Sequence, residues 1–240
     1  MEFKTDFSAV LLMHVFQHVK AAATELGIAT YVVGGFVRDH ILDRKKTPTD
    51  FDFVTVGSGI ELAKAVQARL PNHPKLSIFK TYGTAMIKFE GIDLEFVGAR
   101  KESYREDSRN PQVEEGSLQD DQNRRDFTIN AMAVSLNPED YGTLIDPFNG
   151  LNDLENKLIR TPLDPVITYS DDPLRMLRAI RFATQLDFSI EQTSLDAIFQ
   201  ERERLKIITK ERVVEELHKI MATAVPSKGF LLLDLSLIHI

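Results

Sequence analysis

Two pairs of carboxylates stand at alternating positions in two short, otherwise apolar stretches of the chain. The first pair is Asp50 and Asp52 and the second is Asp93 and Glu95, each separated by one apolar residue. Successive side chains of a strand point to opposite faces, so each pair would share one face. Paired carboxylates repel each other unless a cation lies between them, and such oxygen ligands suit Mg²⁺ bridged to phosphate groups. The spacing indicates a phosphate-handling metal site, and solvated acids on an edge strand would give the same spacing.

A glycine pair precedes the first of these stretches. Gly34 and Gly35 separate a short β-branched run from a helix-like segment, and bare backbone N–H groups at such a helix start can bind phosphate. A simple tight turn explains the pair equally well. A second glycine turn, residues 57–59, resembles half of a dinucleotide-binding fingerprint, but the position of the third glycine is Leu62, and the chain has no Walker A motif. These departures argue against a dinucleotide-binding oxidoreductase.

The elements that must position these residues follow from hydrophobic spacing. Helical spacing predicts helices over residues 7–26 and 60–70, and alternation predicts strands over residues 31–33, 51–56, 84–89 and 92–97. Residues 101–121 are polar and highly charged, which predicts a long loop. From about residue 170 the pattern is helical without a strand, and Ser189 with Gln192 predicts a capping box. We therefore predict an α+β fold, with a small mixed β-sheet and helices in residues 1–150 and an all-helical segment in residues 151–240.

The composition limits the classes of protein that fit. The 240 residues include no cysteine, which excludes disulfide frameworks, zinc knuckles and thiol nucleophiles. The net charge of −7 means that any binding of nucleic acid must be local. No apolar stretch is long enough to span a membrane and the N-terminus lacks the pattern of a signal peptide, so we expect a cytoplasmic protein that does not bind membranes. The apolar segment after Pro226 has no evident polar terminus, and we expect the natural chain to be longer.

Five motifs follow one another in a fixed order. They are GGFVRD with DFD (residues 34–39 and 50–52), RRDFTINA (124–131), IDPFNGLNDL (145–154), DPLRMLRAIRF (172–182) and KERVVEEL (210–217). In this order and spacing, the chain resembles the head of the class II tRNA nucleotidyltransferase and bacterial poly(A) polymerase family, within the DNA polymerase beta superfamily. The resemblance runs from about residue 30 to residue 222. It implies a nucleotidyltransferase head over residues 1–150 and a nucleotide-selecting helical neck over residues 151–240. The tRNA-binding body and tail of the family are mostly missing from these 240 residues.

The resemblance also implies roles for single residues. Asp50 and Asp52 would hold two Mg²⁺ ions, and Glu95 would be the third catalytic carboxylate because it stands five residues before Arg100. Asp93 stays open as the alternative third carboxylate. The nucleotide would be bound by the residues Gly34, Gly35, Arg38, Asp39, Arg125, Asp126, Asn130, Asp172, Arg175, Arg178 and Arg181.

The resemblance assigns these residues to three parts of the nucleotide: the triphosphate, the ribose and the base. The triphosphate would contact Gly35 and Arg38. The ribose would be held by Arg125, Asp126 and Asn130. The Watson–Crick edge of the base would pair with Asp172 and Arg175, supported by Arg178 and Arg181, because arginine donors and aspartate acceptors can read a base edge bidentately.

Structural interpretations of the same residues stay open. Asp172 followed by Pro173 is typical of a helix cap with proline at the first helical position. The three arginines of the DPLRMLRAIRF motif step around a helix, so at least one is expected to form a structural ion pair. The motif also departs from the family at position 171, which is Asp where the family commonly has Glu.

The implied reaction is Mg²⁺-dependent, template-independent transfer of CMP and AMP from CTP and ATP to an RNA 3′ end, with release of pyrophosphate. The implied biological form is CCA addition to tRNA. A poly(A) polymerase, or an enzyme that adds only C or only A, shares the same head motifs. A non-catalytic nucleotide- or RNA-binding relative is a further alternative, disfavoured because both acids of the metal pair are present. The neutral-to-acidic loop and helical segment do not predict tight tRNA binding by these residues alone, and oligomeric state is left open.

Overall fold

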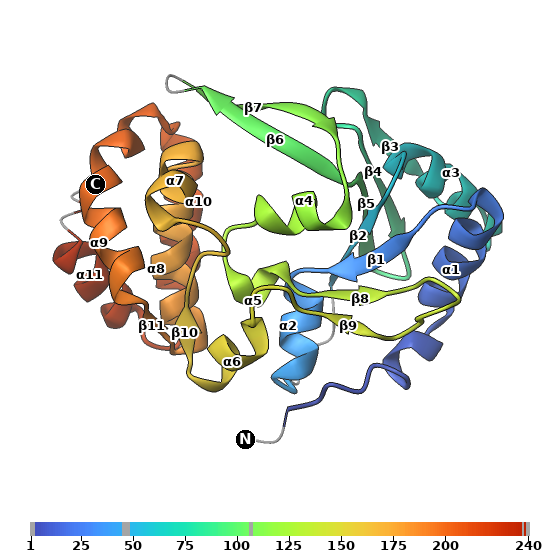
Figure 1. Ribbon diagram of the computed structural model, residues 1–240, viewed down its shortest axis with the longest axis horizontal. Helices are drawn as coiled ribbons and strands as arrows, with labels where there is room; N and C mark the ends of the chain where they lie inside the picture. The colour runs from blue at the N-terminus through green and yellow to red at the C-terminus, as the bar shows by residue number, and fades with distance from the viewer. Residues whose placement is uncertain (1–2, 45–48, 106–107, 237, 239–240) are drawn as a thin grey trace. The chain divides into compact units, whose positions relative to one another are not determined.

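The computed structural model describes residues 3–44, 49–105, 108–236 and 238. The chain forms two compact units that are interleaved in sequence (Figure 1). Unit 1 comprises Met1–Lys101, Glu114–Gln122 and Asn130–Pro147, and unit 2 comprises Glu102–Val113, Asn123–Ile129 and Phe148–Ile240. The division of the chain into domains at residue 150 stays a prediction.

Unit 1 is built on a seven-stranded sheet in the order β3-β4-β5-β2-β1-β8-β9 (Figure 1). In chain order its strands are β1 (Thr30–Val33), β2 (Asp50–Thr55), β3 (Leu76–Phe79), β4 (Thr84–Phe89), β5 (Ile92–Gly98), β8 (Ala133–Ser135) and β9 (Leu144–Ile145). The pair β2 and β5 is parallel, and the other neighbours are antiparallel. The predicted α+β fold with a small mixed sheet is therefore confirmed, and the strands predicted over residues 84–89 and 92–97 are β4 and β5.

One face of this sheet carries the core of unit 1. It packs against α1 (His14–Leu26), α2 (Gly35–Ile41) and α3 (Gly59–Arg69), and a 3-10 turn, η1 (Val10–Leu12), precedes α1. Phe51, Phe53 and Phe96 are fully buried on this face, and the ring centroids of Phe16 and Phe51 lie 4.8 Å apart. Apolar residues at alternating strand positions thus fix which face of β2 and β5 is left for the carboxylates.

A short helix covers part of the opposite face. The helix α4 (Leu118–Asn123) places Leu118 against a small buried cluster formed by Val33, Val54, Ala99 and Ala133. The next helix, α5, is Thr128–Ala131. The Nε2 atom of Gln122 donates to the Ala131 carbonyl at 2.8 Å, which ties the two helices together.

The prediction of a loop over residues 101–121 is wrong. The strands β6 (Arg100–Arg105) and β7 (Ser108–Glu115) form a separate two-stranded sheet before α4, and residues 106–107 lie outside the described part of the chain. A two-stranded ribbon gains its order from backbone hydrogen bonds and needs no buried apolar face, so the hydrophobic period that signals a strand is missing here.

Unit 2 is mainly helical. Its helices are α6 (Gly150–Glu155), α7 (Pro165–Asp171), α8 (Leu174–Leu186), α9 (Gln192–Glu201), η3 (Arg202–Ile207), α10 (Lys210–Met221) and α11 (Pro226–Leu235). Helix α8 packs against α10 and α11, and α7 packs against α9. No helix in the described residues is long and apolar enough to cross a membrane.

Two small features of unit 2 differ from the prediction. The strands β10 (Leu158–Ile159) and β11 (Ser189–Ile190) pair in parallel, so the segment after residue 150 is not entirely helical. Two residues are too few to produce a readable alternation. The predicted capping box at Ser189 is also wrong, because Ser189 belongs to β11 and the N-cap residue of α9 is Glu191, without a side-chain capping hydrogen bond.

Candidate functional site

The four carboxylates of the sequence pattern lie in two matched rows on the sheet. In the parallel pairing of β2 with β5, Asp50 is opposite Asp93 and Asp52 is opposite Glu95. Residues opposite each other in a sheet share a face, so all four acids belong to the face that lies away from the buried phenylalanines. The sequence predicted the sharing of a face within each pair. The register adds that the two pairs are direct neighbours.

The electrostatics of this face favour a bound cation. Burial raises the pKa of Glu95, and the neighbouring charges of Asp50 and Asp93 raise it further. Lys88 relieves this repulsion only weakly, because its Nζ atom lies 3.6 Å from Asp93 Oδ1. That oxygen is buried and accepts no hydrogen bond from the part of the chain that the structure describes.

A divalent cation fits this donor set by its chemistry. Hard carboxylate oxygens are the ligands that Mg²⁺ prefers, and a cation would relieve the repulsion at Glu95. Among the residues that the structure describes, no three acidic or histidine side chains are already gathered into a metal-binding group.

The glycine pair forms the start of α2. Gly34 is the N-cap residue with φ of 76°, a conformation that favours glycine, and its N–H donates to the Met132 carbonyl at 3.4 Å. Gly35 is the first residue of the helix, where a Cβ would meet only Arg38 Nη2, at 3.7 Å. Packing within the described chain therefore leaves room beside Gly35.

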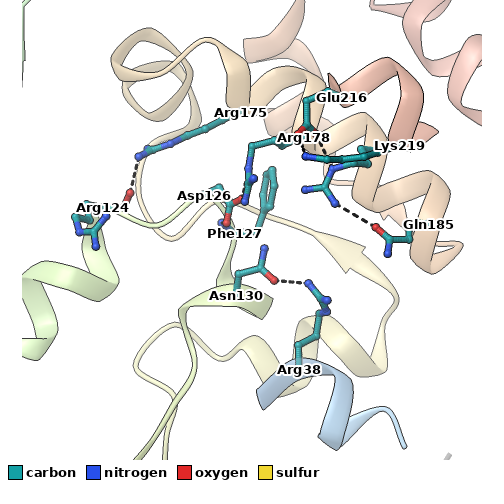
Figure 2. Close-up of polar contacts among 11 residues, drawn as sticks. Arg38, Arg124, Asp126, Phe127, Asn130, Arg175, Arg178, Gln185, Glu216 and Lys219 are labelled. Carbon is teal, nitrogen blue, oxygen red and sulfur yellow. Dashed lines mark hydrogen bonds and ion pairs between the residues drawn. The ribbon is translucent and has the colours of Figure 1, made fainter. Parts of the chain in front are cut away.

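Arg38 is held in place by two of the predicted nucleotide-binding residues. Its guanidinium is buried, and its Nε and Nη2 atoms lie 2.9 and 2.8 Å from Asp39 Oδ1. Its Nη1 atom donates to Asn130 Oδ1 at 2.6 Å (Figure 2). Unit 1 thus brings Asn130 to the neighbouring residues Arg38 and Asp39, which stand about ninety positions earlier in the sequence.

Asp126 is engaged by an arginine of α8. The Nε and Nη2 atoms of Arg178 both donate to Asp126 Oδ2, at 2.8 and 2.5 Å (Figure 2). The other oxygen accepts the backbone N–H of Phe127 at 2.9 Å. The charge of Asp126 raises the pKa of Arg178. Arg125, the neighbouring predicted residue, is partly exposed.

The start of α8 carries the residues predicted to read the base. Asp172 Oδ1 accepts the N–H of Leu174 at 3.2 Å, a capping type of hydrogen bond, although the N-cap residue of α8 is Pro173 and Asp172 ends α7. Arg175 is buried, and its Nη2 atom donates to the Arg124 carbonyl at 2.6 Å (Figure 2). A cap that uses one carboxylate oxygen is compatible with a second role for Asp172, which stays a prediction.

The guanidinium group of Arg181 contacts other side chains of unit 2. Its Nε atom donates to Glu216 Oε2 at 2.5 Å, its Nη1 atom donates to Gln185 Oε1 at 3.2 Å, and its guanidinium carbon lies 3.9 Å from the Phe182 ring centroid. The expectation of at least one structural ion pair among the three arginines is confirmed here. The predicted nucleotide contact of Arg181 stays a prediction.

Sequence reasoning missed two residues that hold these groups. Asp153 is buried and accepts the hydroxyl of Thr128 at 2.6 Å, inside the RRDFTINA motif. Its place in the IDPFNGLNDL motif was a usable signal. Glu102 forms an ion pair with Arg124 at 3.3 Å, and no signal marked it, because it lies in the segment predicted to be a loop.

The comparison with protein families decides the membership of the chain. A family model described as "Poly A polymerase head domain" matches residues 30–160, more than half of the chain. The chain belongs to this family. A second model, described as "Probable RNA and SrmB- binding site of polymerase A", matches residues 187–239. The resemblance read from the five motifs is therefore confirmed.

Members of the class II CCA-adding and poly(A) polymerase family are similar over most of the chain. An A-adding tRNA nucleotidyltransferase from Aquifex aeolicus is 48% identical over 70% of this chain and 20% of its own length. A CCA-adding enzyme from Anoxybacillus flavithermus is 37% identical over 86% of this chain and 50% of its own length.

A solved relative has the same fold. A crystal structure of tRNA nucleotidyltransferase complexed with a primer tRNA and an incoming ATP analog matches with a TM-score of 0.77 and 38% identity, over 90% of this chain and 59% of that chain. The chain thus spans at most about half the length of the two relatives named above.

Proposed function

We propose that this family member transfers CMP and AMP from CTP and ATP to the 3′ end of tRNA, releasing pyrophosphate, as in CCA addition. The observation that carries the proposal is the pairing of Asp50 with Asp93 and of Asp52 with Glu95 on one sheet face. The similarity to A-adding and CCA-adding enzymes supports tRNA and nucleoside triphosphates as the substrates.

Asp50 and Asp52 would hold two Mg²⁺ ions, with Glu95 as the third acid. When bound, Mg²⁺ would make the primer 3′-hydroxyl more acidic and neutralise charge on the departing pyrophosphate. Glu95 is preferred over Asp93 because it stands opposite Asp52 and because the charges of Asp50 and Asp93 both act on it. Asp93 instead has the cation of Lys88 beside it.

The remaining residues position the nucleotide. In the reaction, the primer 3′-oxygen forms a bond to the α-phosphorus while the bond from that phosphorus to the pyrophosphate oxygen breaks, and such transfer depends on positioning and charge neutralisation. Arg38 and the backbone at Gly34 and Gly35 would bind the triphosphate. The fixed hydrogen bond from Arg38 to Asn130 orients both side chains before the nucleotide binds.

The ribose and the base would be held by residues of two further motifs. Arg125, Asp126 and Asn130 would hold the ribose. Asp172 and Arg175 would pair with the base edge, and the hydrogen bond from Arg175 to the Arg124 carbonyl fixes the plane of that guanidinium. Arg178 would act through Asp126, which accepts two of its N–H groups.

Addition of AMP alone is the second candidate. The identity to the A-adding enzyme from Aquifex aeolicus is 48%, against 37% to the CCA-adding enzyme from Anoxybacillus flavithermus, although the former match covers less of this chain. Primers ending in C-C and primers lacking both cytidines separate the two candidates. An A-adding enzyme extends only the first kind.

Calorimetric binding of CTP, ATP, UTP and GTP with Mg²⁺ tests the base-reading residues. We expect CTP and ATP to bind, UTP and GTP to bind weakly, and Asp172→Ala to remove that preference. An A-adding enzyme would bind ATP more tightly than CTP, UTP and GTP. Equal binding of all four nucleotides would contradict the role of Asp172, and failure of all four to bind would contradict the proposed function of this chain.

Extension of an RNA primer tests the carboxylates. Asp52→Asn should lower the rate by more than about 100-fold, since even a residue behind a metal ligand typically contributes 10- to 100-fold. Glu61→Gln is the matched control, because Glu61 is an exposed acid of the same unit on α3. Equal rates for wild type and Asp52→Asn would rule out the metal site on β2.

A further inference from the structure

One segment of this acidic chain is free of acidic residues. Residues 62–89 contain five lysines and arginines and no Asp or Glu, although the whole chain has a net charge of −7. Three of the five cations form ion pairs with acids outside the segment. Lys75 and Lys80 are exposed and form no ion pair with any described residue. Lys75 precedes the strand β3 and Lys80 follows it, so one cation is available for a partner at each end of this edge strand of unit 1.

Two exposed aromatic rings flank Lys80 in the sequence. Phe79 ends β3 and is 48% exposed, and Tyr82 ends the 3-10 turn η2 (Lys80–Tyr82) and is 67% exposed. Neither ring contacts another aromatic ring of the described chain, whereas Phe51, Phe53 and Phe96 stack in the core. We call Lys75, Phe79, Lys80 and Tyr82 the aromatic–basic tip.

The backbone of the tip is well defined. Gly83 closes η2 in the left-handed region, with φ of 62°, and its N–H donates to the Lys80 carbonyl at 3.2 Å. The Nη1 atom of Arg100 donates to the Tyr82 carbonyl at 3.4 Å. The rings are therefore presented by an anchored turn between β3 and β4, and a preformed turn costs little conformational entropy when a partner binds.

Phe79 lies on the face of the sheet that carries the carboxylates. Phe79 is opposite Thr84 and Thr84 is opposite Val97, which stands two residues after Glu95 on β5. Strand spacing and rise put the Cα atom of Phe79 roughly 12 Å from that of Glu95. If the 3′ end of an RNA lies at the carboxylates, the few nucleotides before that end are within reach of the tip, which lies at the β3 edge of the sheet (Figure 1).

We propose that the aromatic–basic tip binds the single-stranded 3′ segment of the RNA primer. Bases stack on the rings of Phe79 and Tyr82, and phosphates pair with Lys75 and Lys80. Stacking on aromatic rings together with nearby cations is the common mode of binding single-stranded nucleic acid, and it tolerates any base. This inference rests on the proposed function, because the primer end must lie at the carboxylates.

The charge pattern favours RNA over a protein strand added to the edge of β3. Strand addition relies on backbone hydrogen bonds, and the charges of Lys75 and Lys80 at the two ends of β3 discourage it. Two unpaired cations beside two rings, with no acid in the segment, instead complement a polyanion that carries flat bases.

Fluorescence of Phe79→Trp tests the stacking directly. The chain contains no tryptophan, so this substitution introduces a single fluorophore that keeps a ring at the tip. Addition of a 12-nucleotide single-stranded RNA at low salt should quench it by base stacking. Leu12→Trp, at a 72% exposed position of unit 1, is the matched control and should not be quenched. Quenching of neither or of both variants would contradict the proposal.

Fluorescence anisotropy of the same 12-nucleotide RNA, carrying a fluorescent label, separates the effects of the aromatic ring, of side-chain size and of charge on RNA binding. Phe79→Leu should weaken binding about tenfold, and Phe79→Tyr should not, since stacking needs the ring. Lys80→Gln should reduce the slope of log Kd against log salt by about 0.7, the contribution of one phosphate contact to a single strand. Lys64→Gln, in the same acid-free segment but paired with Glu61, should leave the slope unchanged.

These measurements distinguish failure of the tip from failure of the proposed function. RNA binding that is unaffected by Phe79→Leu and Lys80→Gln overturns the tip while nucleotide binding with Mg²⁺ still supports the transferase. Absence of RNA binding in all variants, including wild type at low salt, also overturns the tip. Extension assays add a kinetic readout, because loss of primer stacking should raise KM for RNA and leave the calorimetric affinity for ATP unchanged.

Discussion

Arg178 places two N–H groups on a single carboxylate oxygen of Asp126, at 2.8 and 2.5 Å. Asp126 is only 8% exposed, so its charge has little access to water. The contact joins the middle of α8 to the RRDFTINA motif, which stands about fifty residues earlier. A residue proposed to hold the ribose is thus itself held by a residue of the motif proposed to read the base.

Removal of this arginine should destabilise unit 2. Arg178→Ala leaves the buried Asp126 carboxylate without its main partner, and we expect a loss of about 2 kcal/mol in the free energy of unfolding, the scale of a hydrogen bond to a charged group. Arg178→Lys keeps the charge but cannot donate twice from a planar fork, so it should recover only part of the loss. Urea unfolding followed by circular dichroism gives both values.

Arg212→Ala is the control for this prediction. Arg212 lies 3.9 Å from Glu215 in a pair whose side chains are both 57% exposed, and such a pair is worth at most about 0.5 kcal/mol. If Arg178→Ala unfolded no more easily than Arg212→Ala, the contact with Asp126 would carry no stability.

Glu95→Gln should stabilise the metal-free protein. The pKa of Glu95 is raised by burial and by the charges of Asp50 and Asp93, which means that its ionised form is disfavoured in the folded state. Like charges opposite each other in a sheet cost up to about 0.5 kcal/mol when partly screened by solvent, and Gln removes that cost.

Thermal unfolding with and without Mg²⁺ measures both effects of Glu95: repulsion among the acids without the metal, and binding of the metal when it is present. In EDTA the variant should melt slightly higher than wild type, and on addition of Mg²⁺ it should gain less, because it has lost an anionic ligand. Glu61→Gln should change neither value. A lower melting temperature of Glu95→Gln in EDTA would contradict the repulsion inferred among these acids.

Asp153 should act as a positioning residue for the RRDFTINA motif. It is 2% exposed, accepts the Thr128 hydroxyl at 2.6 Å and lies 3.3 Å from Arg160 Nε. Asp153→Ala should cost about 3 kcal/mol of unfolding free energy, since it breaks a buried charged network. Thr128→Val removes only the shared hydrogen bond and should cost about 1 kcal/mol. If the Asp153→Ala variant keeps its affinity for ATP but loses primer extension, Asp153 acts by positioning the motif. Equal losses of unfolding free energy in Asp153→Ala and Thr128→Val would contradict the buried network.

The sequence was sufficient where one physical rule acted alone. Alternation in residues 51–56 predicted which side chains of β2 are buried, because Phe51 and Phe53 must leave water. The helix predicted over residues 7–26 begins later, at His14, but ends at Leu26 as expected, because Gly27 adopts the left-handed conformation, with φ of 65°, that favours glycine. Register between β2 and β5 could not be read from the sequence, because it depends on the pairing of strands about forty residues apart.

Contacts between distant polar residues were also beyond the sequence. Nothing local distinguishes Arg178, which holds Asp126, from Arg181, which pairs with Glu216, since both stand on one helix at similar spacing. The ribbon of β6 and β7 was missed because the sequence of residues 101–115 shows no alternation of apolar residues. Glu102 could not be selected for the same reason, although its carboxylate reaches Arg124.

The buried pair of Arg181 with Glu216 predicts a loss of stability in acid. Burial alone would raise the pKa of Glu216, but Arg181 and Lys219 outweigh it and hold that pKa below its ordinary value of 4.5. An acid with a depressed folded pKa contributes stability above its unfolded pKa, and this contribution is lost as the pH falls through the folded value. Unfolding free energy should therefore fall as the pH drops below about 4.5.

Glu216→Gln isolates this contribution. At pH 7 the variant leaves Arg181 buried without a counter-charge and should lose about 3 kcal/mol. Below about pH 4 the wild-type carboxyl is itself becoming protonated, so the difference between wild type and variant should shrink. Glu215→Gln, an exposed neighbour on α10, should stay within about 0.5 kcal/mol of wild type at every pH. A difference between wild type and Glu216→Gln that is constant from pH 7 to pH 3 would mean that the stabilisation is packing around the side chain and not its charge.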